Sequence, residues 1–106
     1  MLFSLPLVSY TAIGCYRDTP DLAISTLENL DPVLDGPYNT RRNPISKCAV
    51  AAMRRDYKIF ALKDGGLCAA SASCAAPQTF DTPQDPDACL SGEGGPSAYY
   101  AYIIEG

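Results

Sequence analysis

The cysteines constrain what this chain can fold into more than any other feature. Five of its 106 residues are cysteine, and they lie apart from one another, at positions 15, 48, 68, 74 and 89. A zinc site needs closely spaced thiolates or histidines, and this sequence has no histidine. Dispersed cysteines instead indicate disulfide bonds and an oxidising extracellular location, with buried free cysteines in a reducing compartment as the alternative. The length of the chain predicts a single domain.

Charge and hydropathy exclude two kinds of partner. The net charge of -4, with eight Lys and Arg, provides no basic field for a phosphate backbone, so we expect no nucleic-acid partner. No apolar run approaches the roughly 20 residues of a membrane span. Residues 1–13 carry no charge and reach Cys15 early, which fits a secretion signal poorly. We therefore expect any targeting signal to lie elsewhere.

One stretch, "NPISKCAVAAMRRDY", has the features of a helix. Asn43 suits an N-cap, and Pro44 suits the first helical position, where a missing N–H costs nothing. Apolar residues then recur at steps of three and four. The pattern predicts one amphipathic helix from Pro44 to about Arg55, with Cys48 on its buried face.

The following residues, "DYKIFALKDGGLCAAS", predict a hairpin with Asp64-Gly65-Gly66 as its turn. The ending "AYYAYIIEG" predicts a last strand on which Tyr99 faces away from Tyr100 and Tyr102. Residues 18–43 and 71–97 have loop composition. We predict a small disulfide-stabilised α+β domain with one main helix, about residues 44–55, packed on an antiparallel sheet and joined by long loops.

The predicted elements suggest which cysteines pair. The short connection after the helix brings it back onto the hairpin, so Cys48 is expected to pair with Cys68. Cys15 then takes Cys89 and ties the first segment to the last loop. Each closure is worth about 2–4 kcal/mol in a chain-entropy estimate. Cys74 is the odd cysteine and competes with Cys68 for either partner.

Side chains for catalysis or metal binding are few. A nucleophile needs a positioned base, and no histidine is present to supply one. The carboxylates that a glycosidase would need lie in loops rich in proline, where we interpret them as solvated caps and turn formers. These residues are Asp18, Asp21, Glu28 and Asp31. We expect no enzyme, no catalytic residue and no cofactor.

We interpret two further groups of charged residues as ordinary surface residues. Three aspartates occur within seven residues, but they lack EF-hand spacing and have prolines between them, so we expect no metal site. They are Asp81, Asp85 and Asp87. The paired arginines are interpreted as solvated ends, with acidic glycans as an alternative ligand. They are Arg41 with Arg42, and Arg54 with Arg55.

Three stretches together resemble WSC domains, an extracellular module type found in invertebrate secreted proteins: "IGCYRD", "NPISKCAVAAMRRDYKIFALKDGGLCAAS" and "GEGGPSAYYAYII". The resemblance covers residues 13–104. It implies a secreted, disulfide-bonded, non-enzymatic α+β module that binds carbohydrate. Leu67 stands where relatives of the shorter type tend to have Trp, an aromatic that could stack on a sugar. Candidate glycan-binding residues are Tyr16, Arg17, Tyr99, Tyr100 and Tyr102.

The sequence also bears on attached glycans. None of the three asparagines begins an N-x-Ser/Thr acceptor, so we expect no N-linked glycan. O-linked sugar is expected on Ser or Thr near proline. The favoured positions are Thr19, Thr79 and Thr82.

Residues 1–12 form an apolar arm in front of a single WSC-like domain, residues 13–106. Burying each of its large apolar side chains is worth about 1.5–3 kcal/mol, so they are expected to pack somewhere. These side chains belong to Leu2, Phe3, Leu5, Leu7 and Val8. The arm either completes its own sheet or adds to the sheet edge of another copy. A head-to-tail exchange of that kind produces a fibre unless the geometry closes it into a ring. Two functions follow: an extracellular structural subunit that assembles into a filament or matrix, or a carbohydrate-binding module.

Overall fold

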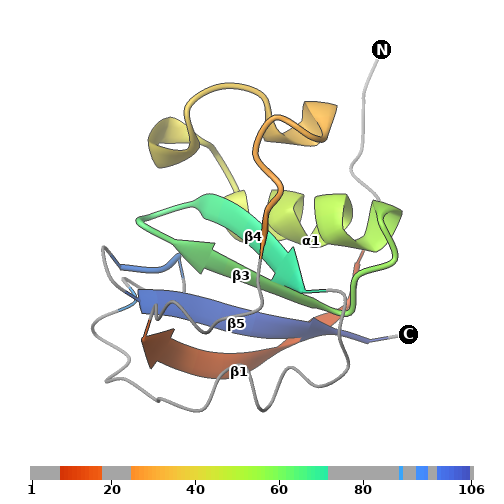
Figure 1. Ribbon diagram of the computed structural model, residues 1–106, viewed down its shortest axis with the longest axis vertical. Coiled ribbons are helices and arrows are strands. Elements are labelled where there is room, and N and C mark those ends of the chain that lie inside the picture. The colour runs from red at the N-terminus through yellow and green to blue at the C-terminus, as the bar shows by residue number, and fades with distance from the viewer. Residues whose placement is uncertain (1–7, 18–24, 72–88, 90–92, 96–97, 106) are drawn as a thin grey trace.

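Five strands form one antiparallel sheet in a computed structural model that describes residues 8–17, 25–71, 89, 93–95 and 98–105. The strand order is β1-β5-β3-β4-β2, and one α-helix packs on the sheet (Figure 1). This arrangement confirms the predicted disulfide-stabilised α+β fold. The elements in chain order are β1 Tyr10–Arg17, β2 Ser25–Thr26, η1 Pro32–Leu34, η2 Tyr38–Thr40, α1 Pro44–Arg54, β3 Ile59–Lys63, β4 Leu67–Ser71 and β5 Ala98–Ile104.

The helix α1 begins and ends almost where the sequence pattern predicts. Pro44 occupies the first turn, and the first backbone bond runs from the Lys47 N–H to the Asn43 carbonyl over 3.1 Å. Asn43 is the N-cap residue, as predicted, but its side chain makes no capping hydrogen bond. Its backbone is left-handed instead, with φ 51°, a conformation that asparagine tolerates better than most residues. Asn43 thus shapes the entry into the helix through its backbone.

The predicted hairpin is also confirmed. Strands β3 and β4 pair from Ile59 opposite Ser71 to Lys63 opposite Leu67, with Asp64, Gly65 and Gly66 as the turn. All three turn residues have positive φ, and a Cβ on Gly66 would lie 2.6 Å from the Tyr38 carbonyl oxygen. The Asp-Gly-Gly sequence therefore satisfies both the turn and the close approach of η2.

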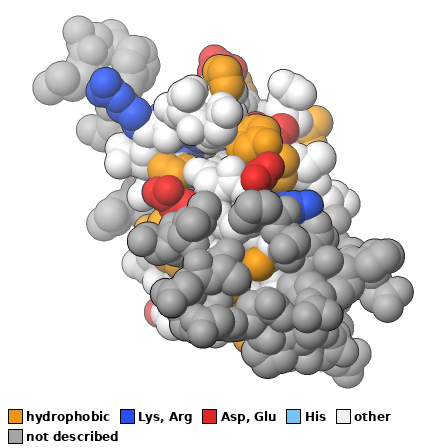
Figure 2. Space-filling view, turned by 90° about the vertical axis from the view of Figure 1, so that its left-hand side faces the viewer, with side chains coloured by type: hydrophobic (Ala, Val, Ile, Leu, Met, Phe, Trp, Pro, Cys, Tyr) orange, Lys and Arg blue, Asp and Glu red, His pale blue; other side chains and the backbone are white. Residues whose placement is uncertain are grey.

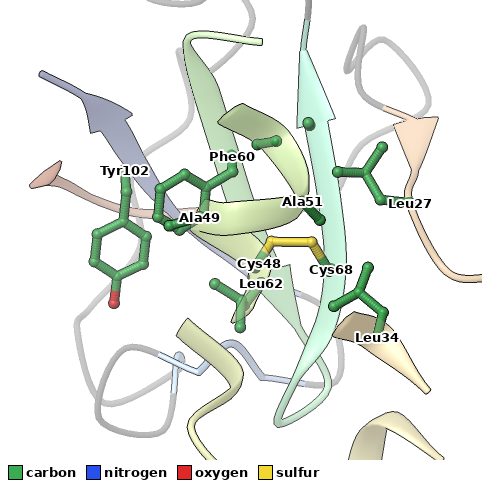
Figure 3. Close-up of a cluster of buried hydrophobic side chains, with 11 residues drawn as sticks. Leu27, Leu34, Cys48, Ala49, Ala51, Phe60, Leu62, Cys68 and Tyr102 are labelled. Atoms are coloured by element: carbon green, nitrogen blue, oxygen red, sulfur yellow. A yellow bond between two sulfur atoms is a disulfide. The ribbon is translucent and has the colours of Figure 1, made fainter. Parts of the chain in front are cut away.

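Both faces of the sheet are buried at β3. Phe60 and Leu62 point toward α1 and share a core with Cys48 and Cys68, as Figure 3 shows. On the opposite face, Ile59 and Ala61 pack with residues of β4 and β5. A strand buried on both sides reads as a continuous apolar run, which explains why "IFAL" is uninterrupted by polar residues.

Two disulfides connect the elements in the predicted pairing. Cys48 on α1 bonds to Cys68 on β4, with 5.4 Å between their Cα atoms, and Cys15 on β1 bonds to Cys89. All four cysteines are buried. Cys74 lies outside the described residues.

The chain enters the sheet earlier than the sequence boundary implies. Strand β1 begins at Tyr10, inside the segment assigned to the arm, and the Tyr10 ring lies edge-on to Phe60 and Tyr102 with centroids 5.4 Å apart. Val8 is half-buried against the same core. Val8 and Tyr10 therefore pack on their own domain. The other predicted assembly residues, Leu2, Phe3, Leu5 and Leu7, lie outside the described residues.

Candidate functional site

Strand β1 forms one edge of the sheet. It pairs with β5 from Tyr10 opposite Ile104 to Arg17 opposite Ala98, and among the described residues no strand pairs with its other side. Thr11, Ala12 and Ile13 are exposed along the strand. Eight residues of edge strand are long enough to accept an added strand.

A bulge interrupts the middle of β1. The register with β5 shifts between Ala12 and Gly14, and Gly14 has φ 145°. The Tyr16 ring covers Gly14, 3.5 Å from where a Cβ would stand. The bulge leaves Ile13 39% exposed, and Ile103, opposite Thr11 on β5, is 41% exposed. Two large apolar side chains thus face solvent near the edge formed by β1.

The β4 side of the sheet is finished differently. The two residues of β2 pair with Ala69 and Ala70 of β4. The chain after β2 then covers Cys68: the Leu27 N–H donates to the Cys68 carbonyl over 2.9 Å, and the Cys68 N–H donates to the Glu28 carboxylate over 2.9 Å. In Figure 1, η1 and η2 lie above β4. This edge of β4 is therefore capped by side chains and loop.

Arg41 fixes the capping carboxylate. Its guanidinium donates two hydrogen bonds to Glu28, over 2.9 and 2.7 Å, and further bonds to the carbonyls of Leu34 and Gly66. The Arg41 side chain is only 1% exposed. Burial raises the pKa of Glu28, but the hydrogen bonds from Arg41 and Cys68 and the charge of Arg41 outweigh it and hold the pKa below its ordinary value.

A second ion-pair cluster ties the end of α1 to η1. The buried Asp31 carboxylate accepts from Arg54 over 3.0 Å, from Arg55 over 2.8 Å and from the Val33 N–H over 3.0 Å. Arg55 also donates to the Leu30 carbonyl. Burial raises the pKa of Asp31. The hydrogen bond from Val33 and the two arginines lower this pKa by a larger amount, so the net shift is downward.

The interpretation of these charged residues as solvated is wrong for three of them. Arg41 and Asp31 are buried, and Glu28 is partly buried in an ion pair. The capping role predicted for the carboxylates does hold at Asp31, which caps η1. Arg42 is exposed, as predicted. Asp18 and Asp21 lie outside the described residues. The ion pairs of Glu28 and Asp31 join residues 13 to 24 positions apart, and no sequence pattern indicates pairs at such separations.

A surface hollow of about 440 Å³ lies over the loop that contains η1. It is open and mostly polar, and its lining residues are Asn29, Leu30, Asp31, Pro32, Leu34, Asp35 and Gly36. Leu30 is 55% exposed beside it. The Asp31 oxygens face Arg54 and Arg55, so this carboxylate is already neutralised.

The tyrosines divide between the two faces as predicted. Tyr99 packs with Ile59 and Tyr16 on one face, while Tyr100 and Tyr102 contact the core under α1 on the other. Tyr99 and Tyr102 are buried, and burial raises the pKa of Tyr102 well above its ordinary value. Tyr16 and Tyr100 are half-buried, and Arg17 ends β1. The rings of Tyr99 and Tyr102 therefore serve the core and are not open to a sugar.

On the face drawn in Figure 2, the described residues carry small apolar areas. Figure 2 shows orange side chains in separate patches between white and red ones on the face that lies at the left of Figure 1.

Within the described residues, no three His, Cys, Asp or Glu side chains group as a metal site would require. Nor does that part of the chain contain a helix with the length and apolarity to cross a membrane. The remaining predicted sites, Asp81, Asp85, Asp87, Thr19, Thr79 and Thr82, lie outside it.

No family model matches the chain, and a search of curated proteins finds no match. The likeness to WSC domains therefore stays a prediction.

Proposed function

We propose that this protein is a non-enzymatic extracellular structural subunit that associates with copies of itself at the β1 edge. The observation that carries the proposal is the contrast between the two sides of the sheet. Strand β1 has a partner on one side only among the described residues, whereas β4 is covered by β2, Leu27 and Glu28. An added strand at β1 would gain main-chain hydrogen bonds and cover exposed apolar side chains.

The apolar arm is the segment that we propose as the added strand. Val8 packs on its own core, so the segment available to a neighbour is residues 2–7. Four of these six residues are Leu or Phe, and each such side chain gains about 1.5–3 kcal/mol on burial. Pro6 lacks an N–H, so the arm would pair along one side only. Each copy then donates one strand and accepts one, which produces a filament or matrix.

Two further observations support an extracellular, structural role. Both disulfides are buried and hold α1, β1 and β4 in place, which suits a rigid building block in an oxidising environment. Among the described residues, ion pairs join different elements of the domain: Glu28 pairs with Arg41, and Asp31 pairs with Arg54 and Arg55. In a secreted WSC-like module, such a scaffold would present its edges to neighbours.

Point substitutions at the edge test the proposal. Ile13→Lys places a charge on β1, and we expect it to reduce association of the full-length protein at least tenfold, measured by light scattering during size-exclusion chromatography. Leu30→Lys is the matched control, because it makes the same change at a more exposed side chain on the η1 loop. Equal effects of both variants, or none from either, would contradict association at β1.

The same purified protein tests the alternative, a carbohydrate-binding module. A protein that stays monomeric across the concentration range and binds immobilised glycans would favour that module over the structural subunit. The exposed residues beside the hollow, Leu30 and Asp35, would then be the first positions to substitute.

A further inference from the structure

We propose that Glu28 and Arg41 form an edge lock that prevents β4 from accepting a strand of another copy, so that copies join only at β1. The lock is a property of a single copy. Its consequence for assembly rests on the proposed self-association.

The strand β2 is too short to protect β4 by itself. It covers only Ala69 and Ala70. At Cys68 both outward backbone groups are taken by the chain that follows β2. The Cys68 N–H donates to the Glu28 carboxylate over 2.9 Å, and the Cys68 carbonyl accepts from the Leu27 N–H over 2.9 Å and from the Thr26 hydroxyl over 3.3 Å. The Glu28 carboxylate thus takes the place of a paired strand.

Arg41 keeps that carboxylate in position. Besides its two bonds to Glu28, it donates to the Leu34 carbonyl over 2.7 Å and to the Gly66 carbonyl over 3.2 Å. It therefore joins the η1 loop to the β3–β4 turn. A strand that reached Cys68 would have to displace Glu28 and leave the Arg41 guanidinium buried without its counter-ion, which is strongly unfavourable.

Along β1, the described residues show no outward backbone group bonded in this way, although the bulge between Ala12 and Gly14 divides the edge. The proposal is that the sheet grows at β1, whereas β4 is covered by β2 and the lock. Assembly through β1 alone adds copies in one direction, whereas two open sides would allow the sheets to grow laterally into an aggregate. The lock would decide between an ordered assembly and unlimited sheet growth.

Paired substitutions test the lock without leaving a buried charge unpaired. Glu28→Leu with Arg41→Met removes the carboxylate and the guanidinium together. We expect hydrogen exchange of the Cys68 amide to rise more than tenfold while the Phe60 amide keeps its rate. Asp31→Asn is the matched control, because it removes the other arginine-paired carboxylate, which does not contact β4. Glu28→Gln with Arg41→Met is the conservative second pair, because it too leaves no buried guanidinium without a counter-ion. It keeps an acceptor for the Cys68 N–H, and its effect should be smaller.

Association is then measured in the Ile13→Lys background, in which the β1 edge is blocked. The unlocked double variant should associate there, and the Asp31→Asn control should not. Unchanged Cys68 exchange in both Glu28 variants, or faster exchange without new association, would overturn the lock. Failure of Ile13→Lys to reduce association of the otherwise unchanged protein would instead refute the proposed function. The Cys68 exchange rate is independent of that result.

Discussion

At the scale of single residues, Gly94 is the described glycine at which an added Cβ would come closest to the backbone of another segment. Its φ is +84°, and a Cβ there would lie 2.1 Å from the Leu62 carbonyl oxygen. The contact is held by hydrogen bonds, because the Gly65 N–H donates to the Gly94 carbonyl and the Gly94 N–H to the Cys89 carbonyl. Only glycine allows the segment before β5 to approach β3 this closely.

Gly94→Ala should therefore lower the free energy of unfolding by about 2–5 kcal/mol, from an unfavourable backbone conformation and overpacking together. Gly65→Ala is the control. Its φ is nearly the same, +86°, but a Cβ there meets nothing within 4 Å, so only the backbone cost of about 1–2 kcal/mol applies. Denaturant unfolding with intact disulfides measures both. Equal losses of unfolding free energy in the two variants would show that the Leu62 carbonyl does not crowd a Cβ at position 94.

The two paired carboxylates predict how stability depends on pH. The pKa values of Glu28 and Asp31 lie below their ordinary values of 4.5 and 3.8. As the pH falls, the two carboxylates are therefore protonated in the unfolded chain before they are protonated in the folded protein. The stability that they contribute above their ordinary pKa values is lost as the pH falls through their pKa values in the folded protein. Unfolding free energies measured between about pH 6 and pH 2 should decrease toward acid, and less steeply in Asp31→Asn. The same slope in the variant and the native protein would contradict this account of Asp31.

At the scale of elements, the sequence predicts what depends on local pattern. The helix Pro44–Arg54 and the hairpin around Asp64 follow from short-range periodicity and turn chemistry, and the tyrosine faces follow from strand alternation. The ion pair between Glu28 and Arg41 depends on how a loop folds back over β4. No sequence spacing encodes that return, so the capped edge and the burial of Arg41 could not be predicted. The bulge at Ile13 is missed for the same reason.

The two disulfides differ in the length of chain that they close, 74 residues for Cys15–Cys89 and 20 for Cys48–Cys68. In the chain-entropy model the longer loop is worth roughly 4.5 kcal/mol and the shorter roughly 3.3 kcal/mol. Replacing both cysteines of one pair with alanine should thus destabilise the protein more for Cys15 and Cys89. Thermal unfolding of the two double variants compares them. A larger loss for Cys48 and Cys68 would show that packing between α1 and β4 outweighs loop closure.

At the scale of the whole molecule, we propose a domain with one accepting edge, at β1, and one capped edge, at β4. The core under α1, the two disulfides and the ion pair between Glu28 and Arg41 connect the elements of this domain. We propose that growth at β1 depends on the apolar residues that precede Val8. The central claim is that those residues hold copies together and are not needed to hold one copy folded.

Sedimentation velocity of the full-length double variant Leu5→Glu with Leu7→Glu tests that claim most directly. We predict that it sediments as a monomer with an unchanged melting temperature, while the unchanged protein sediments as larger species. The control, Leu30→Glu with Met53→Glu, alters two exposed apolar residues elsewhere by the same charge and should assemble normally. If the Leu5 and Leu7 variant instead melts at a lower temperature and its assembly matches the control, the arm belongs to its own domain and the account is wrong.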